Sequence, residues 1–115
     1  MELLPPRVRR LLCERYPIGS QDGQGDAAKV IVKLFFPAGR YTLYVTEGED
    51  LGDDVNLFGY CISALGPDCD EWGYSSLAEI EHVSVRGLRV ERDVTIEPEK
   101  YTVAELKKLD GRLIS

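Results

Sequence analysis

The sequence predicts an α+β fold: a single domain with an antiparallel meander sheet of four to five strands and short N-terminal, middle and C-terminal helices. Three observations predict it. The chain of 115 residues has the length of one domain, which we place at residues 1–115. Helical periodicity is confined to the two ends and one short central segment. The segments between are rich in β-branched and aromatic residues, and their short connections favour antiparallel neighbours over crossover units.

The first helix is predicted from an apolar stripe near the start of the chain. Its members recur at helical spacing: Leu3, Leu4, Val8, Leu11, Leu12 and Tyr16. Pro5 and Pro6 fit the first turn, where a missing N–H costs little, and Pro17 ends the helix. Residues 19–25 follow with the composition of a glycine-rich loop.

The strands are predicted from runs of β-branched and aromatic residues. They span residues 29–36, 40–46, 55–63 and 71–74, and a final edge strand is expected at Val94–Ile96. Pro37-Ala-Gly39 joins the first two into a hairpin. Gly48–Asp54 is an acidic loop before the third strand, and Gly66-Pro-Asp68 is a turn before the fourth.

Two capping boxes predict the other helices. A hydroxyl residue at the N-cap is followed by Glu in two places: Ser75 or Ser76 before Glu79, and Thr102 before Glu105. The first box begins a short helix, Leu77–His82. The second begins the last helix, in which Leu106 and Leu109 are expected to face inward.

The acidic residues are concentrated in one part of the chain. Residues 47–82 carry ten acidic side chains and no Lys or Arg, whereas the segments on either side are close to balanced. The acids are Glu47, Glu49, Asp50, Asp53, Asp54, Asp68, Asp70, Glu71, Glu79 and Glu81. One surface is therefore expected to hold nearly all of the net charge of −6 and to exert the strongest field on a partner.

Composition also bounds the compartment and the class of partner. The longest apolar run, Val30–Phe36, is too short to span a bilayer, and no charged-then-apolar leader opens the chain. We therefore expect a cytoplasmic protein with no membrane partner. Cys13, Cys61 and Cys69 lack C-x-x-C spacing, which disfavours a zinc site or a disulfide framework. The net negative charge disfavours direct binding of nucleic acid, because phosphate binding needs clustered cations.

A catalytic centre is not predicted. The single histidine, His82, stands beside Glu81 near the end of a short helix, where it could act as a general base. The nucleophiles that it could serve across the sheet are Cys61, Cys69, Ser75 and Ser76. A histidine at a helix C-terminus also suits the helix dipole, and no nucleophile-elbow glycines surround any serine. We therefore expect no catalytic residue and no cofactor, and favour a protein that is not an enzyme.

Metal binding is the chemical alternative. Mg²⁺ and Ca²⁺ take several oxygen ligands, and Asp50, Asp53 and Asp54 lie within five positions of one another. With Glu79 they would give a metal-assisted hydrolase or nuclease that uses the acidic loop. The spacing does not reproduce an EF-hand loop, so a solvated acidic loop is the preferred interpretation and no metal ligand is assigned.

The aromatic residues lie mostly on the predicted strands. They are Phe35, Phe36, Tyr41, Tyr44, Phe58, Tyr60, Trp72 and Tyr74. Side chains alternate along a strand, so about half of these should face the core. An outward row could stack the bases of a single-stranded nucleic acid, but that requires interleaved cations, which residues 47–82 lack. Core packing is favoured.

Six short motifs occur in a familiar order. They are Leu3-Leu-Pro5, Lys33-Leu-Phe-Phe-Pro37, Tyr41-Thr-Leu-Tyr-Val-Thr-Glu47, Leu57-Phe-Gly59, Gly73-Tyr-Ser-Ser-Leu-Ala-Glu-Ile80 and Gly87-Leu-Arg-Val-Glu-Arg-Asp93. The series, over about residues 3–109, resembles a bacterial family catalogued as domain of unknown function 2958. The resemblance implies no reaction. It implies an accessory protein of plasmids and other mobile elements, with candidate residues Glu47, Glu79, Glu91, Arg92 and Asp93 in the matched motifs.

Together these patterns lead to one functional hypothesis. We expect a non-enzymatic, acidic accessory protein of a mobile element that binds a basic protein surface, as an inhibitor of host nucleic-acid-handling or defence machinery of the anti-restriction or anti-CRISPR type. Carboxylates would guide the encounter, and exposed apolar side chains would anchor it. The expected partner-binding residues are Glu47, Asp50, Leu51, Asp53, Asp54, Asp68, Asp70, Glu71, Trp72 and Tyr74.

Overall fold

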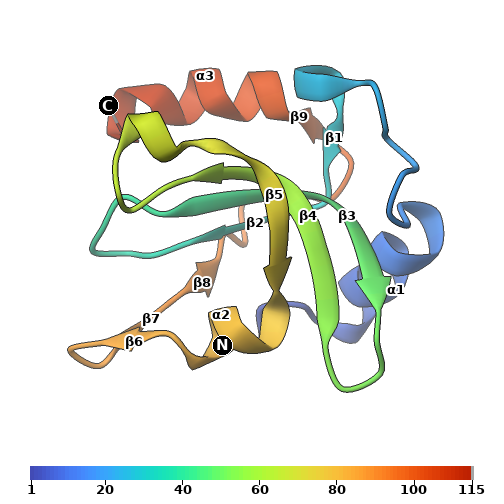
Figure 1. Ribbon diagram of the computed structural model, residues 1–115, viewed down its shortest axis with the longest axis horizontal. Helices are drawn as coiled ribbons and strands as arrows, with labels where there is room; N and C mark the ends of the chain where they lie inside the picture. Colours follow the sequence, from blue (N-terminus) through green and yellow to red (C-terminus); the bar gives the residue numbers. More distant parts are fainter. Residues whose placement is uncertain (115) are drawn as a thin grey trace.

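The computed structural model describes residues 1–114 of the chain and has the predicted α+β architecture (Figure 1). Its helices are α1 (Pro6–Arg15), α2 (Leu77–His82) and α3 (Val103–Ile114). The main sheet is antiparallel and five-stranded in the order β5 (Glu71–Ser76), β4 (Val55–Ile62), β3 (Thr42–Asp50), β2 (Val32–Phe35) and β8 (Glu91–Arg92). Strands β5 to β2 follow the predicted meander, since each pairs with its neighbour along the chain.

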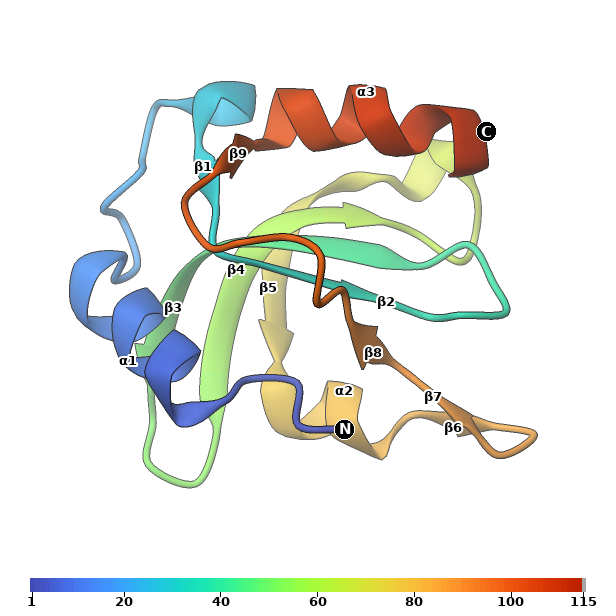
Figure 2. The same ribbon diagram turned by 180° about the vertical axis from the view of Figure 1, so that it is seen from behind.

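Two short strand pairs complete the structure. One joins β1 (Lys29–Val30) to β9 (Tyr101–Thr102) at the start of α3, and the other is a hairpin of β6 (Ser84–Val85) and β7 (Leu88–Arg89). The β6–β7 hairpin projects from the body of the molecule after α2 (Figures 1 and 2). Short 3₁₀ turns lie at Gly25–Ala27 and Pro67–Cys69.

The sheet separates two apolar cores. On one face, α1, α2 and the N-terminal segment pack on the central strands, and Leu12 of α1 shares a core with Leu43 and Leu57. On the other face, α3 lies across the sheet and packs Val103 and Leu106 against Tyr44 (Figure 2). Strand β3 therefore runs between two packed layers, and its residues from Thr42 through Gly48 are all buried.

Helix α1 approaches β3 closely. Pro6 opens the helix as predicted, and Leu12 is fully buried. A side chain at Gly48 would place its Cβ 2.6 Å from Leu12 Cδ2, and Gly48 N donates to Tyr16 O at 3.0 Å. Glycine at this position lets the helix settle on the strand, and it sets the distance between α1 and the acidic end of β3.

Both predicted N-caps are present, and the one at α3 is a full capping box. Glu79 N donates to Ser76 Oγ at 3.2 Å at the start of α2, which selects Ser76 over Ser75 as the N-cap. At the start of α3, Thr102 N donates to Glu105 Oε1 at 2.9 Å, and Glu105 N donates to Thr102 Oγ1 at 3.2 Å. Caps are local, so sequence spacing alone located them.

Two predictions about the C-terminal third are wrong. Val94–Ile96 is a turn rather than a strand, because Asp93 Oδ1 accepts from Thr95 N at 3.0 Å and ends the edge strand at Arg92. Leu109 does not face inward and is 59% exposed. Asp110 takes the inward position on α3 instead, where it meets Tyr44 and Lys33. Leu106 is buried as expected.

The acidic loop is also shorter than predicted. Strand β3 continues through Asp50 in register with β4, so Glu47 to Asp50 belong to the strand, and residues 51–54 alone form the turn. The predicted strand 29–36 is divided into β1 and β2 at Ile31. No helix among residues 1–114 is long and apolar enough to cross a membrane.

Candidate functional site

The acidic residues do not gather on one surface, so the expectation of a single acidic face is wrong. Asp50, Asp53 and Asp54 lie at the β3–β4 turn, directly before β4. Asp68, Asp70 and Glu71 lie after the other end of β4. Eight residues of strand separate the two groups, a span of about 25 Å at roughly 3.3 Å per residue. Figure 1 shows them at opposite ends of the sheet.

Glu47 is buried and serves the fold. Its residue is 4% exposed, and its carboxylate accepts from Gly19 N at 2.8 Å and from Gln21 N at 2.7 Å. These bonds fasten the glycine-rich loop after α1 to the middle of β3. Glu47 is therefore not available to the partner for which it was predicted.

Asp50 is paired within the chain. Arg9 on α1 donates from Nη2 to Oδ1 at 2.7 Å and from Nε to Oδ2 at 3.1 Å, and Gly52 N donates to Oδ1 at 2.8 Å. The Arg9 guanidinium and the Gly52 amide lower the pKa of the Asp50 carboxyl to about 2. The pair links α1 to the β3–β4 turn and neutralises this carboxylate.

Asp54 caps the start of α2. It accepts from Ser76 Oγ at 2.6 Å, from Ala78 N at 2.9 Å and from Val55 N at 2.7 Å. The Ser76 hydroxyl first, and then the two amides, lower the pKa of the Asp54 carboxyl. Its position opposite α2 follows from the β4–β5 register, which pairs Asn56 with Ser76.

Asp70 closes the connection between β4 and β5. Arg40 donates to both of its carboxylate oxygens at 2.8 and 2.7 Å, and Ser63 N donates to Oδ1 at 2.7 Å. Arg40 Nη1 also donates to Ser63 O at 2.8 Å. This bidentate contact lowers the pKa of the Asp70 carboxyl. Arg40 and Asp70 stabilise the loop and leave little charge to attract a partner.

Six of the ten acids remain exposed, without an ion pair among the described residues. They are Glu49, Asp53, Asp68, Glu71, Glu79 and Glu81. Asp68 and Glu71 stand at the start of β5, and Asp53 and Glu79 stand near its end, beside α2. The unpaired charge therefore flanks β5 at both ends.

The chemical alternatives depended on the acidic loop, on His82 and on the nucleophiles that His82 could serve. No group of three His, Cys, Asp or Glu side chains in the described part of the chain could hold a metal ion. His82 Nδ1 lies 2.6 Å from Ala78 O in its own helix. Burial raises the pKa of the Cys13 and Cys61 thiols, which disfavours their thiolates. Cys69 is exposed.

The aromatic residues of β4 and β5 form one cluster on the α3 side of the sheet. The ring centroids of Phe58 and Trp72 lie 5.8 Å apart, those of Phe58 and Tyr74 4.9 Å, and those of Tyr60 and Trp72 5.7 Å. Lys107 Nζ lies 3.6 Å from the centre of the Tyr60 ring. Tyr74 is 62% exposed at the outer end of this cluster. Leu51, on the distant turn, is exposed apart from it.

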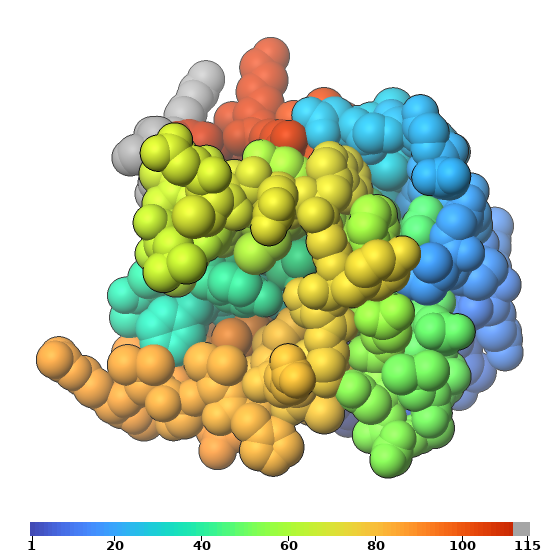
Figure 3. Space-filling model, in the orientation of Figure 1, coloured from blue at the N-terminus to red at the C-terminus, as the bar shows by residue number. Residues whose placement is uncertain are grey.

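Strand β5 is an open edge of the sheet. It pairs with β4 alone, and residues 71–76 form no other main-chain hydrogen bond within the described chain. In the space-filling view, β5 (yellow) crosses this face uncovered (Figure 3). The opposite edge, β8, is two residues long, and Arg92 N donates to Met1 Sδ at 3.2 Å. The N-terminal segment thus covers one edge, whereas β5 keeps a row of unpaired main-chain groups.

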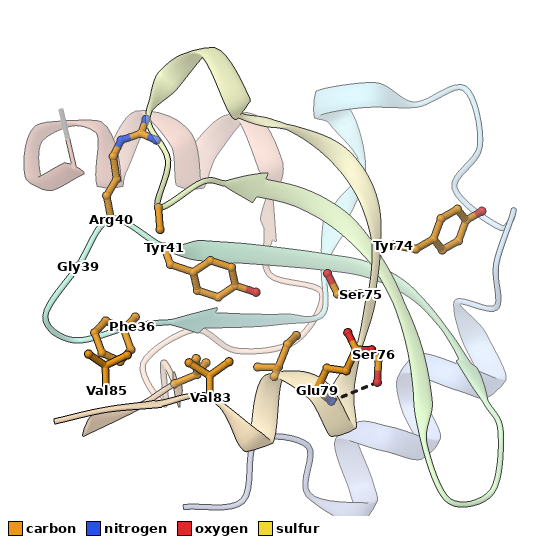
Figure 4. Close-up of a pocket in the computed structure, with 13 residues that line it drawn as sticks. Phe36, Gly39, Arg40, Tyr41, Tyr74, Ser75, Ser76, Glu79, Val83 and Val85 are labelled. Carbon is orange, nitrogen blue, oxygen red and sulfur yellow. Dashed lines mark hydrogen bonds between the residues drawn. The ribbon is translucent and has the colours of Figure 1, made fainter. Parts of the chain in front are cut away.

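A cavity of about 560 Å³ adjoins this edge (Figure 4). Its walls come from β5, from α2, from the β2–β3 turn and from the β6–β7 hairpin. Sequence reasoning missed this cavity, because its walls come from segments far apart in the chain. The open edge did have a signal: residues 71–76 contain neither Lys nor Pro, two residues that protect edge strands.

Comparison with known proteins places the chain in a family. The model of the family described as protein of unknown function (DUF2958) matches residues 3–109, and the chain therefore belongs to that family. This agrees with the resemblance seen in the six sequence motifs. No curated protein and no solved structure matches the chain.

Proposed function

We propose that this member of the DUF2958 family is a non-enzymatic binding protein that captures an extended, basic segment of a partner protein along the outer edge of β5. The observation that carries the proposal is the edge itself: six residues of strand that pair on one side only. Such an edge accepts an additional strand through main-chain hydrogen bonds. A partner segment would extend the sheet beyond β5.

The carboxylates around β5 favour a segment with a positive charge as the ligand. The unpaired carboxylates of Asp68 and Glu71 lie at one end of β5, and those of Asp53 and Glu79 at the other. No Lys or Arg occurs in residues 47–82. Lysines or arginines on the incoming segment would meet these carboxylates, which raises the association rate and fixes the position of the segment along the strand.

The exposed aromatic side chain on β5 also supports binding at this edge. Tyr74 is 62% exposed, and its ring contacts Phe58 on the neighbouring strand. An added strand would bring side chains beside Tyr74 on this face, at the spacing of cross-strand neighbours. Tyrosine supplies a large contact area with few rotatable bonds.

The partner class that we propose is a protein that handles nucleic acid in the cytoplasm. Its basic segments evolved to meet phosphates, and the carboxylates at the β5 edge offer the same sign of charge. A segment held at β5 is withheld from nucleic acid, so capture amounts to inhibition. An anti-restriction or anti-CRISPR inhibitor encoded by a mobile element is one form of this activity.

The test uses defined peptides. The probe is a nine-residue peptide of alternating Lys and Thr, titrated into the ¹⁵N-labelled protein at low ionic strength. We expect amide shifts centred on residues 71–76. A second peptide with the same charges carries N-methyl groups on alternate residues, which removes the main-chain donors of one edge. Equal binding of both peptides, or no binding of either, would overturn the proposal.

A matched pair of variants tests the charges. Asp53→Lys with Glu71→Lys places cations at both ends of β5, and we expect about tenfold weaker binding of the Lys-Thr peptide. Glu2→Lys with Glu14→Lys makes the same change of net charge away from β5, and we expect a much smaller loss. Comparable losses from both pairs would mean that net charge, rather than this edge, attracts the peptide.

Affinity capture extends the test to a natural partner. The wild type and both variant pairs serve as baits in a bacterial lysate, with recovery read by mass spectrometry. We expect basic, nucleic-acid-handling proteins with the wild type and with the Glu2/Glu14 pair, and their loss with the Asp53/Glu71 pair. Recovery of the same proteins by all three baits would contradict the proposed partner class.

A further inference from the structure

The cavity beside β5 gives the proposed segment a specific anchor, an inference that rests on the proposed function. We infer that the cavity receives one aromatic side chain with a polar atom, Trp or Tyr, from the segment docked on β5. The partner class is thereby narrowed to an extended basic segment with a single aromatic residue between its cations.

The cavity lies on the side of the sheet that alternate residues of a docked strand would face. Ser75 lines the cavity, and its cross-strand partner Leu57 belongs to the core beneath α1 and α2. Trp72, three positions before Ser75 and therefore on the other face of β5, packs in the opposite core, under α3. Side chains of an added strand follow the same alternation, so every second one would point toward the cavity.

The walls of the cavity fit an aromatic ring. Phe36, Ile80 and Val83 contribute apolar surface from the β2–β3 turn, α2 and the segment after α2, and Val85 closes the outer side from the β6–β7 hairpin (Figure 4). Val83 and Val85 are 42% and 52% exposed, so the apolar wall is incompletely covered within the chain. The volume of about 560 Å³ exceeds that of any single side chain, which leaves room for an indole.

Two hydroxyl groups enter the same cavity. Figure 4 shows the Tyr41 hydroxyl and the Ser75 side chain directed into it, and neither forms a hydrogen bond within the described chain. Burial raises the pKa of Tyr41 to about 12, so its phenol stays protonated and able to donate. A Trp N–H or a Tyr hydroxyl requires a partner when buried, and these hydroxyls supply one.

The space at Gly73 also favours an occupant. A Cβ built at Gly73 would meet no atom within 4 Å, although Gly73 pairs with Gly59 in the middle of the β4–β5 ladder. At Gly59, by contrast, a Cβ would lie 1.9 Å from Tyr44 O, so packing within the chain explains that glycine. Packing does not explain Gly73. Because Gly73 has no side chain, the surface of β5 beside the cavity has room for a large side chain of the docked segment.

The rim of the cavity decides where the cations of the segment lie. Glu79 is on the rim and forms no ion pair among the described residues. The Arg40 guanidinium, also at the rim, is bonded to Asp70. Arg86 stands at the tip of the β6–β7 hairpin beyond the cavity. The cations of the segment are therefore expected two residues from its aromatic residue, toward Glu71 and Glu79 and away from the hairpin.

The experiment compares two peptides that differ at one position. Both have the sequence Lys-Thr-Lys-Thr-X-Thr-Lys-Thr-Lys, with Trp or Ala at X, and binding is measured by titration calorimetry. We expect the Trp peptide to bind at least about tenfold more tightly, since an inserted aromatic side chain is a typical anchor. Equal binding of the two peptides would overturn the anchor and leave the edge proposal standing. No binding of either would overturn both.

Two variants that fill the cavity complete the test. Ser75→Leu fills it from β5, and Val85→Trp fills it from the exposed hairpin, where the fold does not depend on the side chain. With either variant we expect the preference for Trp over Ala to fall to about one, with the Ala peptide unaffected. A Trp preference that persists in a folded Val85→Trp protein would contradict insertion into this cavity. The second variant keeps the test informative if Ser75→Leu does not fold.

Discussion

The carboxylate of Asp54 and the hydroxyl of Ser76 lie 2.6 Å apart and join the β3–β4 turn to the first turn of α2. The other oxygen of Asp54 accepts from Ala78 N. The Asp54 side chain therefore links the β3–β4 turn to α2, and its contact with Ser76 spans 22 positions of the sequence. The N-cap residue of α2, Ser76, is thus held from outside the helix. An acidic turn that resembles a binding surface in the sequence proves to be part of the fold.

The first prediction follows from that contact. Asp54→Ala removes the acceptor for Ser76 and for the Ala78 amide, and loss of a helix cap lowers stability. We expect the midpoint of thermal unfolding to fall by about 4 °C. Asp53→Ala is the matched control, because Asp53 is exposed and its side chain forms no hydrogen bond or ion pair among the described residues. Equal shifts for the two variants would contradict the capping role.

The second prediction concerns the stability of the protein at acid pH. Asp50, Asp54 and Asp70 have folded pKa values below the ordinary 3.8, Asp50 at about 2. The unfolded chain therefore takes up protons first as the pH falls, and stability decreases with it. The contribution of these three carboxylates to stability is complete when the pH lies above the ordinary pKa. It is lost as the pH falls through their pKa values in the folded protein. We expect the urea midpoint to decrease between about pH 4 and pH 2.

Substitution identifies the groups responsible. Asp50→Asn and Asp70→Asn each remove a carboxylate that Arg9 or Arg40 holds in its charged form. The decrease in urea midpoint with acid should be shallower in each variant than in the wild type. Asp53→Asn is the control, because it removes an exposed carboxylate that forms no ion pair among the described residues. An unaltered slope in both variants would place the acid sensitivity elsewhere in the chain.

Local features of this fold were readable from the sequence. The capping residues Ser76 and Thr102 act within their own helices, and the Pro37-Ala-Gly39 turn acts within its own hairpin. Alternation and short connections then gave the order of the central strands. Each of these signals depends on residues a few positions apart, which is the range over which sequence patterns are informative.

The candidate site was less accessible to sequence reasoning because its parts meet over long distances. Ten acids in one stretch suggested one surface, but Arg9 reaches Asp50 across 41 positions and Arg40 reaches Asp70 across 30. Nothing local reveals which cation will fold onto which carboxylate. Trp72 and Tyr74 were predicted to contact a partner, and the structure places Tyr74 on the open edge. The cavity that makes this edge distinctive required the fold.

The third prediction concerns a charged network between the sheet and α3. Lys33 Nζ lies 2.8 Å from Asp110 Oδ2 and 3.3 Å from Asp93 Oδ2, and Tyr44 Oη donates to Asp110 at 2.7 Å. The Lys33 and Asp110 side chains are 11% and 7% exposed. Lys33→Met leaves a buried carboxylate without its cation, and we expect a loss of about 3 kcal/mol in urea unfolding.

The companion variant separates charge from packing. In the Lys33→Met protein, Asp110→Asn removes the uncompensated charge and keeps an oxygen that can accept from Tyr44. We expect it to restore about half of the lost stability. If Asp110→Asn instead adds its own loss to that of Lys33→Met, the two side chains are not coupled and the network does not hold α3 to the sheet.

The last prediction contrasts two glycines. Gly48→Ala would place a Cβ 2.6 Å from Leu12 Cδ2 and 2.7 Å from Leu12 Cγ, in a core where Leu12 is fully buried. We expect Gly48→Ala to cost about 2 kcal/mol, because α1 must move away from β3. Gly73→Ala meets nothing within 4 Å on β5 and should be neutral or stabilising by about 0.5 kcal/mol.

Leu12→Val, which removes the crowded Cδ atoms, should cost less in the Gly48→Ala background than alone, as a double-mutant cycle would show. Equal costs in the two backgrounds would mean that the approach of α1 to β3 does not depend on Gly48.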